Sequence, residues 1–135
     1  MANLSYISAN AELAALAPLM NSGFIEVYSG PMPANANTAL SGSNTLLATL
    51  TLSPTAFGAP SMGTITANTI GSAPAINTAI AVFARIYQSD GITVVMDVTV
   101  GISGSGAEMI VATTSFIGGA TISCSGFTHT ITSAP

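Results

Sequence analysis

Apolar residues near the start of the chain recur at the spacing of an α-helix. Between residues 9 and 22 these positions hold Leu13, Leu16, Leu19 and Met20. This period predicts one short helix. Ser8 or Asn10 can cap its start, and Gly23 can end it. Because Pro18 lacks the N–H that an inner helical turn needs, we expect a break or kink just before it.

After the helix the pattern changes to the alternation of β-strands, in which every second side chain is apolar. Ile80 shares the apolar face of its strand with Val82, Ala84 and Ile86, and Ile92 faces inward on the next strand. Turn residues separate the alternating runs, which cover about 24–30, 45–52, 63–70, 79–87, 92–100, 109–117 and 120–132. Short strands at this spacing predict an all-β fold.

These strands carry apolar residues on one face and Thr or Ala on the other, which favours two packed sheets. We therefore predict a β-sandwich of about seven to eight strands with one short N-terminal helix. Residues 1–135 suit a single domain of this kind. Jelly-roll and immunoglobulin-like strand orders give the same pattern, so both remain open.

Glycines mark the connections between strands. Asp90-Gly91 stands between two β-branched runs and predicts a two-residue type I′ hairpin turn, because both turn positions need a positive φ. Gly118-Gly119 predicts a second hairpin that joins the last two runs. The apolar phase changes at Gly126 within the last strand, so we expect a β-bulge there.

Charge is nearly absent from the chain. Charged residues make up 4% of the 135 residues, with Arg85 the only Lys or Arg, whereas ordinary soluble domains carry roughly 25%. Nucleic-acid binding and attraction to anionic lipid are excluded, because both need several cations. Such a surface favours packing against further copies or a partner. The alternative is a thermostable or secreted β-protein that tolerates low charge.

The start of the chain lacks the basic segment of a secretory leader, and Glu12 interrupts its apolar stretch. No apolar run reaches the length of a membrane span. We therefore expect synthesis in the cytoplasm and no membrane contact. Cys124 is the only cysteine, so an intrachain disulfide is impossible, and a catalytic pair with His129 has little support.

Catalytic and ligand-binding patterns are weak. Glu26, Asp97 and Glu108 could supply paired carboxylates for glycoside hydrolysis, but the chain has no Trp to form a sugar platform. One His, one Cys and scattered acids give no zinc spacing, and the other positions of a calcium loop are missing. The Gly-rich stretch 101–108 lacks the Lys of a phosphate loop. We predict no enzyme activity, metal or cofactor.

The lone cation lies on the strand that enters the Asp90-Gly91 hairpin. In a tight hairpin, position 85 lies across from about position 96, with Asp97 beside it. We therefore predict a structural ion pair between Arg85 and Asp97. The alternative is that Arg85 contacts a partner at an interface.

The order of several segments resembles a family of small virion proteins of tailed bacteriophages. An N-terminal Ala/Leu helix is followed by a strand ending in "YSG", then "PMP", then an Asn/Ala/Gly loop that leads to "TLLATLTL" and "FG". Later come "IYQSDG", a "GG" pair and a Ser/Thr-rich closing strand over 118–132. The resemblance covers most of the chain and rests on this order.

The resemblance implies a capsid decoration or cement protein on the head surface of a virion. Its partners would be the major capsid protein and further copies of the chain, as a dimer or trimer. The loop between the first two strands, residues 31–43, would then be a recognition tip or an inter-subunit contact, stiffened by its prolines. Its candidate interface residues are Pro31, Met32, Pro33, Asn35 and Asn37.

Other functions fit the same composition. A tail, neck or tail-tip structural protein predicts few copies in a ring. A displayed carbohydrate-binding or adhesion module predicts glycan binding, for which Tyr28 or Tyr87 could serve as a platform. The loop over residues 31–43 could also be a solvent-exposed connector with no function of its own.

Overall fold

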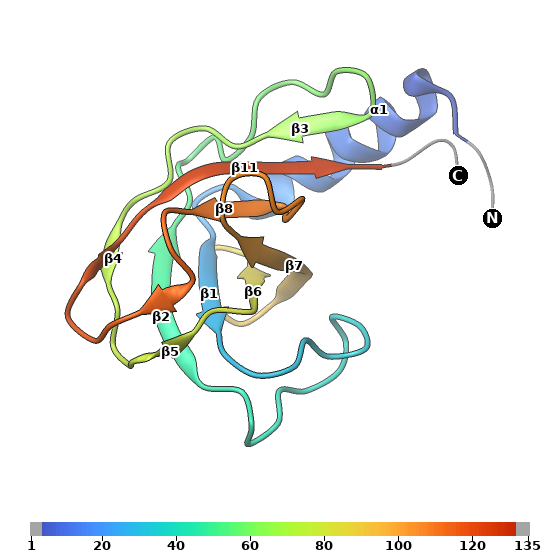
Figure 1. Ribbon diagram of the computed structural model, residues 1–135. Helices are drawn as coiled ribbons and strands as arrows, with labels where there is room; N and C mark the ends of the chain where they lie inside the picture. The colour runs from blue at the N-terminus through green and yellow to red at the C-terminus, as the bar shows by residue number, and fades with distance from the viewer. Residues whose placement is uncertain (1–3, 132–135) are drawn as a thin grey trace.

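The structure is a computed structural model that describes residues 4–131 (Figure 1). Helix α1 (Tyr6–Leu16) begins three residues before the predicted segment, because Ser5 is its N-cap and accepts a 3.2 Å hydrogen bond from the Ser8 N–H. It continues into the 3-10 helix η1 (Ala17–Met20), which contains Pro18. No helix among residues 4–131 is long and apolar enough to cross a membrane.

The rest of the described chain forms short strands. They are β1 (Phe24–Tyr28), β2 (Leu46–Thr51), β3 (Thr64–Thr66), β4 (Ala73–Pro74), β5 (Ala79–Ile80), β6 (Phe83–Tyr87), β7 (Val94–Gly101), β8 (Met109–Val111), β9 (Ser115–Phe116), β10 (Thr121–Ile122) and β11 (Cys124–Thr130). Three predicted strands are interrupted, since the runs 79–87, 109–117 and 120–132 each contain two separate strands.

The predicted sandwich is wrong, in its jelly-roll and immunoglobulin-like forms alike. Seven strands form one open mixed sheet in the order β2-β1-β6-β7-β8-β11-β3. Two small antiparallel sheets, β4 with β10 and β5 with β9, complete the fold. The pairing of β7 with β8 is parallel and covers only two residue pairs, Val100 with Met109 and Gly101 with Ile110.

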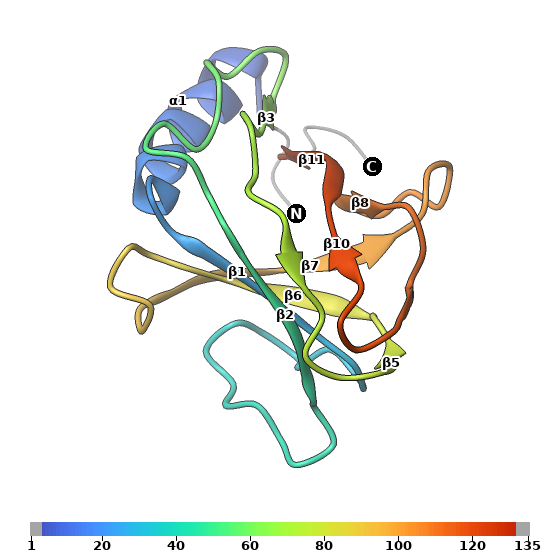
Figure 2. The ribbon, with the colours of Figure 1, turned by 90° about the vertical axis from the view of Figure 1, so that its left-hand side faces the viewer.

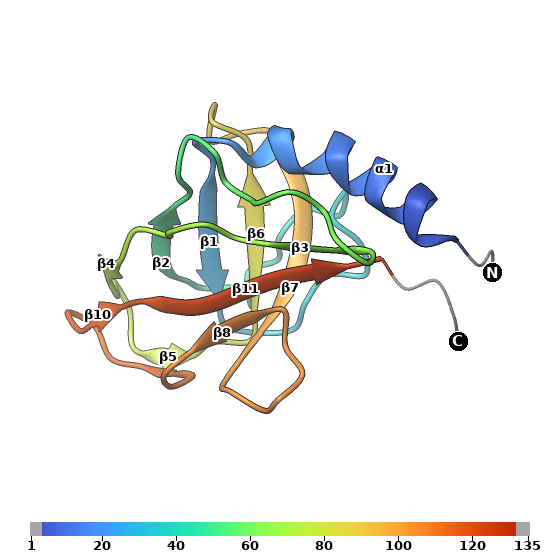
Figure 3. The ribbon, with the colours of Figure 1, turned by 90° about the horizontal axis from the view of Figure 1, so that it is seen from above.

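The large sheet turns sharply at the β7–β8 pairing. Figure 3 shows β8, β11 and β3 running across the direction of β1, β2, β6 and β7. Both parts of the sheet therefore contribute apolar side chains to one core, which also includes Leu13 and Met20 from the N-terminal helices. The alternating pattern shows only which side chains face a core. One sheet that bends over itself gives the same pattern as two separate sheets, so the pattern could not distinguish them.

The hairpin between β6 and β7 forms at the predicted place with a different turn. Gly91 has φ +71° and donates its N–H to the Gln88 carbonyl at 2.9 Å, but Asp90 is not among the residues with positive φ. The type I′ prediction is therefore wrong. The Asp90 carboxylate accepts 2.8 Å hydrogen bonds from the N–H groups of Ile92 and Thr93. These bonds hold a wider connection over residues 88–93.

The second predicted hairpin is present only in part. β8 pairs antiparallel with β11, and the register shifts between Cys124 and Gly126, where the bulge was expected. β9 and β10 do not pair with each other, because β9 pairs with β5 and β10 with β4. Three apolar residues assigned to apolar faces are exposed instead: Ile92, 80% exposed in the connection, Ile80, 55% exposed in β5, and Val82, 40% exposed between β5 and β6.

Candidate functional site

The connection between β1 and β2, residues 29–45, is the longest one among the described strands and contains the predicted contact loop. Its base is closed by a 3.0 Å hydrogen bond from the Ser29 N–H to the Thr45 carbonyl. Figure 2 shows this loop, in cyan, on the side of β1 and β6 that is opposite to β3 and β11. We call the face of β1, β6 and β7 on this side the outer face.

Arg85 connects the loop to the outer face. Its Nη2 atom donates a 2.9 Å hydrogen bond to the carbonyl oxygen of Thr38, in the middle of the loop. The same side chain forms a two-pronged pair with Asp97, Nε to Oδ1 at 2.7 Å and Nη2 to Oδ2 at 2.9 Å. Arg85 and Asp97 stand directly opposite each other in the register of β6 and β7.

This ion pair is almost fully buried. The side chains of Arg85 and Asp97 are 5% and 3% exposed. The hydrogen bond to Asp97 raises the pKa of the Arg85 guanidinium above its ordinary value, against the opposing effect of burial. A buried charge is tolerated when it is paired and hydrogen-bonded, as this one is. The only cation of the chain therefore acts inside the protein.

Two stacked aromatic rings also lie on the outer face. Tyr28 and Phe83 are opposite each other on β1 and β6, stack with ring centroids 5.5 Å apart, and are both buried. The Tyr28 hydroxyl donates a 2.6 Å hydrogen bond to Glu26 Oε1. Burial, followed by this bond to Glu26, raises the pKa of Tyr28 above its usual range. Burial also raises the pKa of the neighbouring Tyr87.

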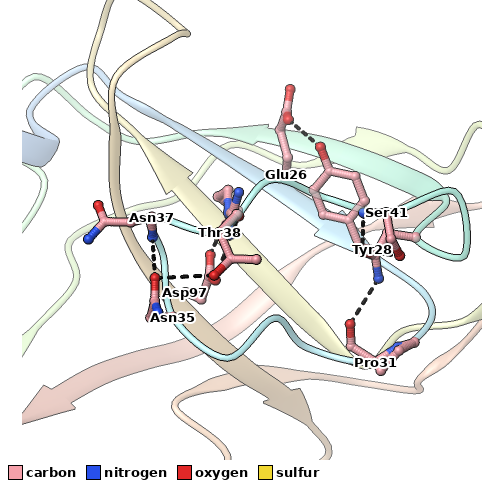
Figure 4. Close-up of polar contacts among 10 residues, drawn as sticks. Glu26, Tyr28, Pro31, Asn35, Asn37, Thr38, Ser41 and Asp97 are labelled. Atoms are coloured by element: carbon pink, nitrogen blue, oxygen red, sulfur yellow. Dashed lines mark hydrogen bonds and ion pairs between the residues drawn. The ribbon is translucent and has the colours of Figure 1, made fainter.

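Asparagine side chains shape the loop from within (Figure 4). Asn35 Oδ1 accepts from the Asn37 N–H at 2.9 Å and from the Thr38 hydroxyl at 3.3 Å. Asn44 Nδ2 donates to the carbonyl oxygens of Ser29 and Pro31 at 3.2 and 2.9 Å. These bonds give the loop a defined conformation on both sides of Thr38.

The predicted contact residues lie on the outer side of this loop. Pro31, Met32, Asn35 and Asn37 are exposed, and Pro33 is half-buried. A shallow hollow of about 160 Å³ is lined by Pro31, Met32, Pro33, Thr38, Ala39, Ser41 and Asn44. The loop therefore presents a neutral surface made of proline rings, a thioether, hydroxyls and amides. No sequence signal points to the Thr38 contact, since every residue has a carbonyl oxygen.

The other candidate chemical groups have partners of their own. The predicted turn residue Asp90 accepts bonds from Thr93 and Ile92, which lower the pKa of its carboxyl group, the Thr93 hydroxyl most. His129 Nδ1 lies 2.6 Å from Glu108 Oε2. The Cys124 thiol donates to the Gly126 carbonyl at 3.2 Å, and burial raises its pKa. Within residues 4–131, no group of three or more His, Cys, Asp or Glu is placed to hold a metal.

A hollow of about 640 Å³ lies where β3 and β11 separate. The Ala67 N–H still donates to the Phe127 carbonyl at 2.9 Å, and beyond that bond the two segments diverge. Residues 67–70 and 124–127 line the opening. It is an open gap in a strand pairing, and its lining includes the Cys124 thiol and the hydroxyls of Thr69 and Ser125.

Comparison of the chain with family models, with curated proteins and with solved structures finds no match. The resemblance to tailed-phage virion proteins therefore stays a prediction that rests on the order of segments in the sequence. The composition of the surface and the geometry of the loop are the remaining basis for a functional proposal.

Proposed function

We propose that the chain is a non-enzymatic virion structural protein that decorates the outer surface of a tailed-phage head and strengthens the shell. Its principal partner in this proposal is the major capsid protein. The observation that carries the proposal is the composition of the surface, because the only cation is buried against Asp97 while many large apolar side chains are exposed. Permanent interfaces are more apolar than the ordinary surface of a protein.

The loop over residues 29–45 is the part we assign to contact with the shell. Arg85 holds its centre and Asn44 holds its base, so binding needs little further ordering of the backbone. A preorganised loop loses less conformational entropy on binding than a free one. Its exposed Pro31 and Met32 offer apolar contact without charge that must be desolvated.

The non-enzymatic part of the proposal is supported by the partners of the acidic side chains. Glu26 accepts from Tyr28, Asp97 binds Arg85, and Glu108 lies against His129. These are the three carboxylates that the sequence offers as possible catalytic pairs for glycoside hydrolysis. Each is engaged in a contact that stabilises the local structure.

The experiment is a rebinding assay with purified heads that lack this chain. Added wild-type protein should bind in a number of copies close to that of the coat protein and raise the temperature at which heads release their DNA. Met32→Asp should bind at least tenfold more weakly, because it places a charge in the contact loop. The matched control, Met62→Asp, changes another exposed methionine far from that loop in the sequence and should bind like the wild type.

Heads that bind no added protein, or that are equally stable with and without it, would refute the cement role. A tail or neck position is the second candidate, and a count of a few copies per particle would favour it. A carbohydrate-binding module has less support, because Tyr28 is buried and stacked on Phe83 and Tyr87 is half-buried, so neither ring is fully exposed as a sugar platform.

A further inference from the structure

One end of the molecule has no charged side chain. It consists of residues 69–82 and 111–124, which include the two small sheets β4·β10 and β5·β9. These segments hold no Asp, Glu, Lys, Arg or His. Figure 3 shows β4, β10 and β5 at the side of the molecule away from the start of α1. We call residues 69–82 and 111–124 the charge-free end.

Two isoleucines form an exposed apolar pair on this end. Ile80 is opposite Ser115 in the pairing of β5 with β9, and the same register places Thr78 opposite Ile117. A 2.9 Å hydrogen bond from the Gly118 N–H to the Thr78 hydroxyl supports this extension. Ile80 and Ile117 are therefore diagonal neighbours on one face. They are 55% and 63% exposed, although the opposite face of the same pairing buries Phe116.

The acidic groups lie elsewhere on the molecule. Glu12 is on α1, Glu26 on the outer face of β1, Asp90 in the 88–93 connection, and Glu108 just before β8. The formal net charge is −4, and Arg85 is already paired. Two copies that approach through these regions bring like charges together, which is unfavourable. Two copies that approach through the charge-free end do not.

We propose that the charge-free end is the surface through which this chain binds a second copy of itself. In this dimer, Ile80 and Ile117 of one copy pack against the same two residues of the other across a two-fold axis. A two-fold interface uses one patch twice, so that patch must be compatible with itself, as a neutral apolar patch is. The inference depends on charge placement and exposure and is independent of the virion role.

The test is sedimentation velocity over a range of protein concentrations. The wild type should sediment as a dimer, and Ile80→Lys and Ile117→Lys should each weaken association at least tenfold, because a buried unpaired charge is costly. The control is Ile92→Lys, which makes the same change at an isoleucine 80% exposed outside the charge-free end. It should associate like the wild type. Circular dichroism should show that all three variants remain folded.

Two further measurements sharpen the result. Added salt should leave the association constant unchanged or raise it. Salt screens the repulsion between the acidic groups of the two copies, and the proposed interface contains no charge whose attraction it could weaken. A mixture of Ile80→Lys with Ile80→Glu should associate more tightly than either variant alone, because the introduced charges then attract across the interface.

A wild type that stays monomeric at every concentration would overturn the proposal. So would an oligomer that both charge-free-end variants leave intact, or one that Ile92→Lys disrupts equally. Absence of the chain from virions would refute the decoration role but would leave this dimer untouched.

Discussion

The guanidinium of Arg85 binds the carbonyl oxygen of Thr38 at 2.9 Å, although the two residues are 47 positions apart in the chain. Because the same guanidinium binds Asp97, one side chain joins the 29–45 loop to β6 and β7 at once. The same residue therefore holds the centre of the loop and balances the charge of Asp97 on the outer face.

Removal of this cation should destabilise the fold strongly. Arg85→Met leaves the buried Asp97 carboxylate without its partner, and breaking such a pair costs about 3–5 kcal/mol. Urea unfolding at neutral pH measures the loss. The double variant Arg85→Met/Asp97→Leu should recover most of it, because an apolar pair leaves no unpaired charge. Equal losses in the single and double variants would contradict this account.

The loop should respond to a change that preserves the charge. Arg85→Lys keeps a cation near Asp97, but an ammonium group cannot reproduce the planar, two-pronged geometry that also reaches Thr38. We expect hydrogen exchange at the loop amides of Asn37 and Thr38 to become faster, while amides of β1 and β2 keep their protection. Unchanged exchange at both loop amides would show that Arg85 does not hold the loop.

The glycine after Asp90 should be sensitive to substitution. Gly91 has φ +71°, a conformation that costs an L-residue about 1 kcal/mol. Gly91→Ala should lower the melting temperature by several degrees in a domain of this size. The control is Gly42→Ala, since Gly42 is not among the glycines with positive φ and has open space around its α-carbon. Equal melting temperatures for the two variants would argue against strain at Gly91.

Alkaline pH should weaken the fold through Tyr28. Its folded-state pKa is raised by burial and by Glu26, while its unfolded-state pKa is near 10. Below about pH 10 the phenol is protonated in both states, so its contribution is complete. Above about pH 10 the unfolded chain loses the proton and the folded chain keeps it. The free energy of unfolding should therefore fall as the pH rises.

Urea titrations from about pH 8 to about pH 11 measure this slope. Tyr28→Phe should make it shallower, because the group that ionises in the unfolded chain is gone. Some slope should remain from Tyr87, whose pKa is also raised by burial. At neutral pH the same variant should lose about 1 kcal/mol, the contribution of its hydrogen bond to Glu26. A slope identical to that of the wild type would exclude Tyr28 as its source.

Local pattern was enough to place the larger elements. The helical period located α1 to within three residues at its start, and strand alternation located β1, β2, β6 and β7. The pairing of Arg85 with Asp97 also follows from local sequence, because the two residues belong to one hairpin. Alternation and hairpin signals involve residues that are close in the sequence, so they are sufficient to predict these elements and this ion pair.

Long-range arrangement could not be predicted in the same way. The parallel β7–β8 pairing covers two residue pairs, and β4, β5, β9 and β10 have two residues each, too few to show a period. The two-residue turn expected at Asp90-Gly91 does not form, because the Asp90 carboxylate accepts hydrogen bonds from the N–H groups of Ile92 and Thr93 and the connection is wider. The support of the loop depends on a backbone carbonyl, which no side-chain pattern reveals.

The place of β11 between β8 and β3 has a consequence for how the chain assembles. β3 lies near the middle of the sequence, yet its partner in the large sheet is β11, the last strand described. Ile65 of β3 belongs to the same buried cluster as Leu13 of α1 and Phe127 of β11. On a ribosome, the hairpin of β6 and β7 can form while the chain is still growing. The cluster that joins α1, β3 and β11 cannot form until β11 has been synthesised, so the packing of the N-terminal helix depends on contacts that are distant in the sequence and form slowly.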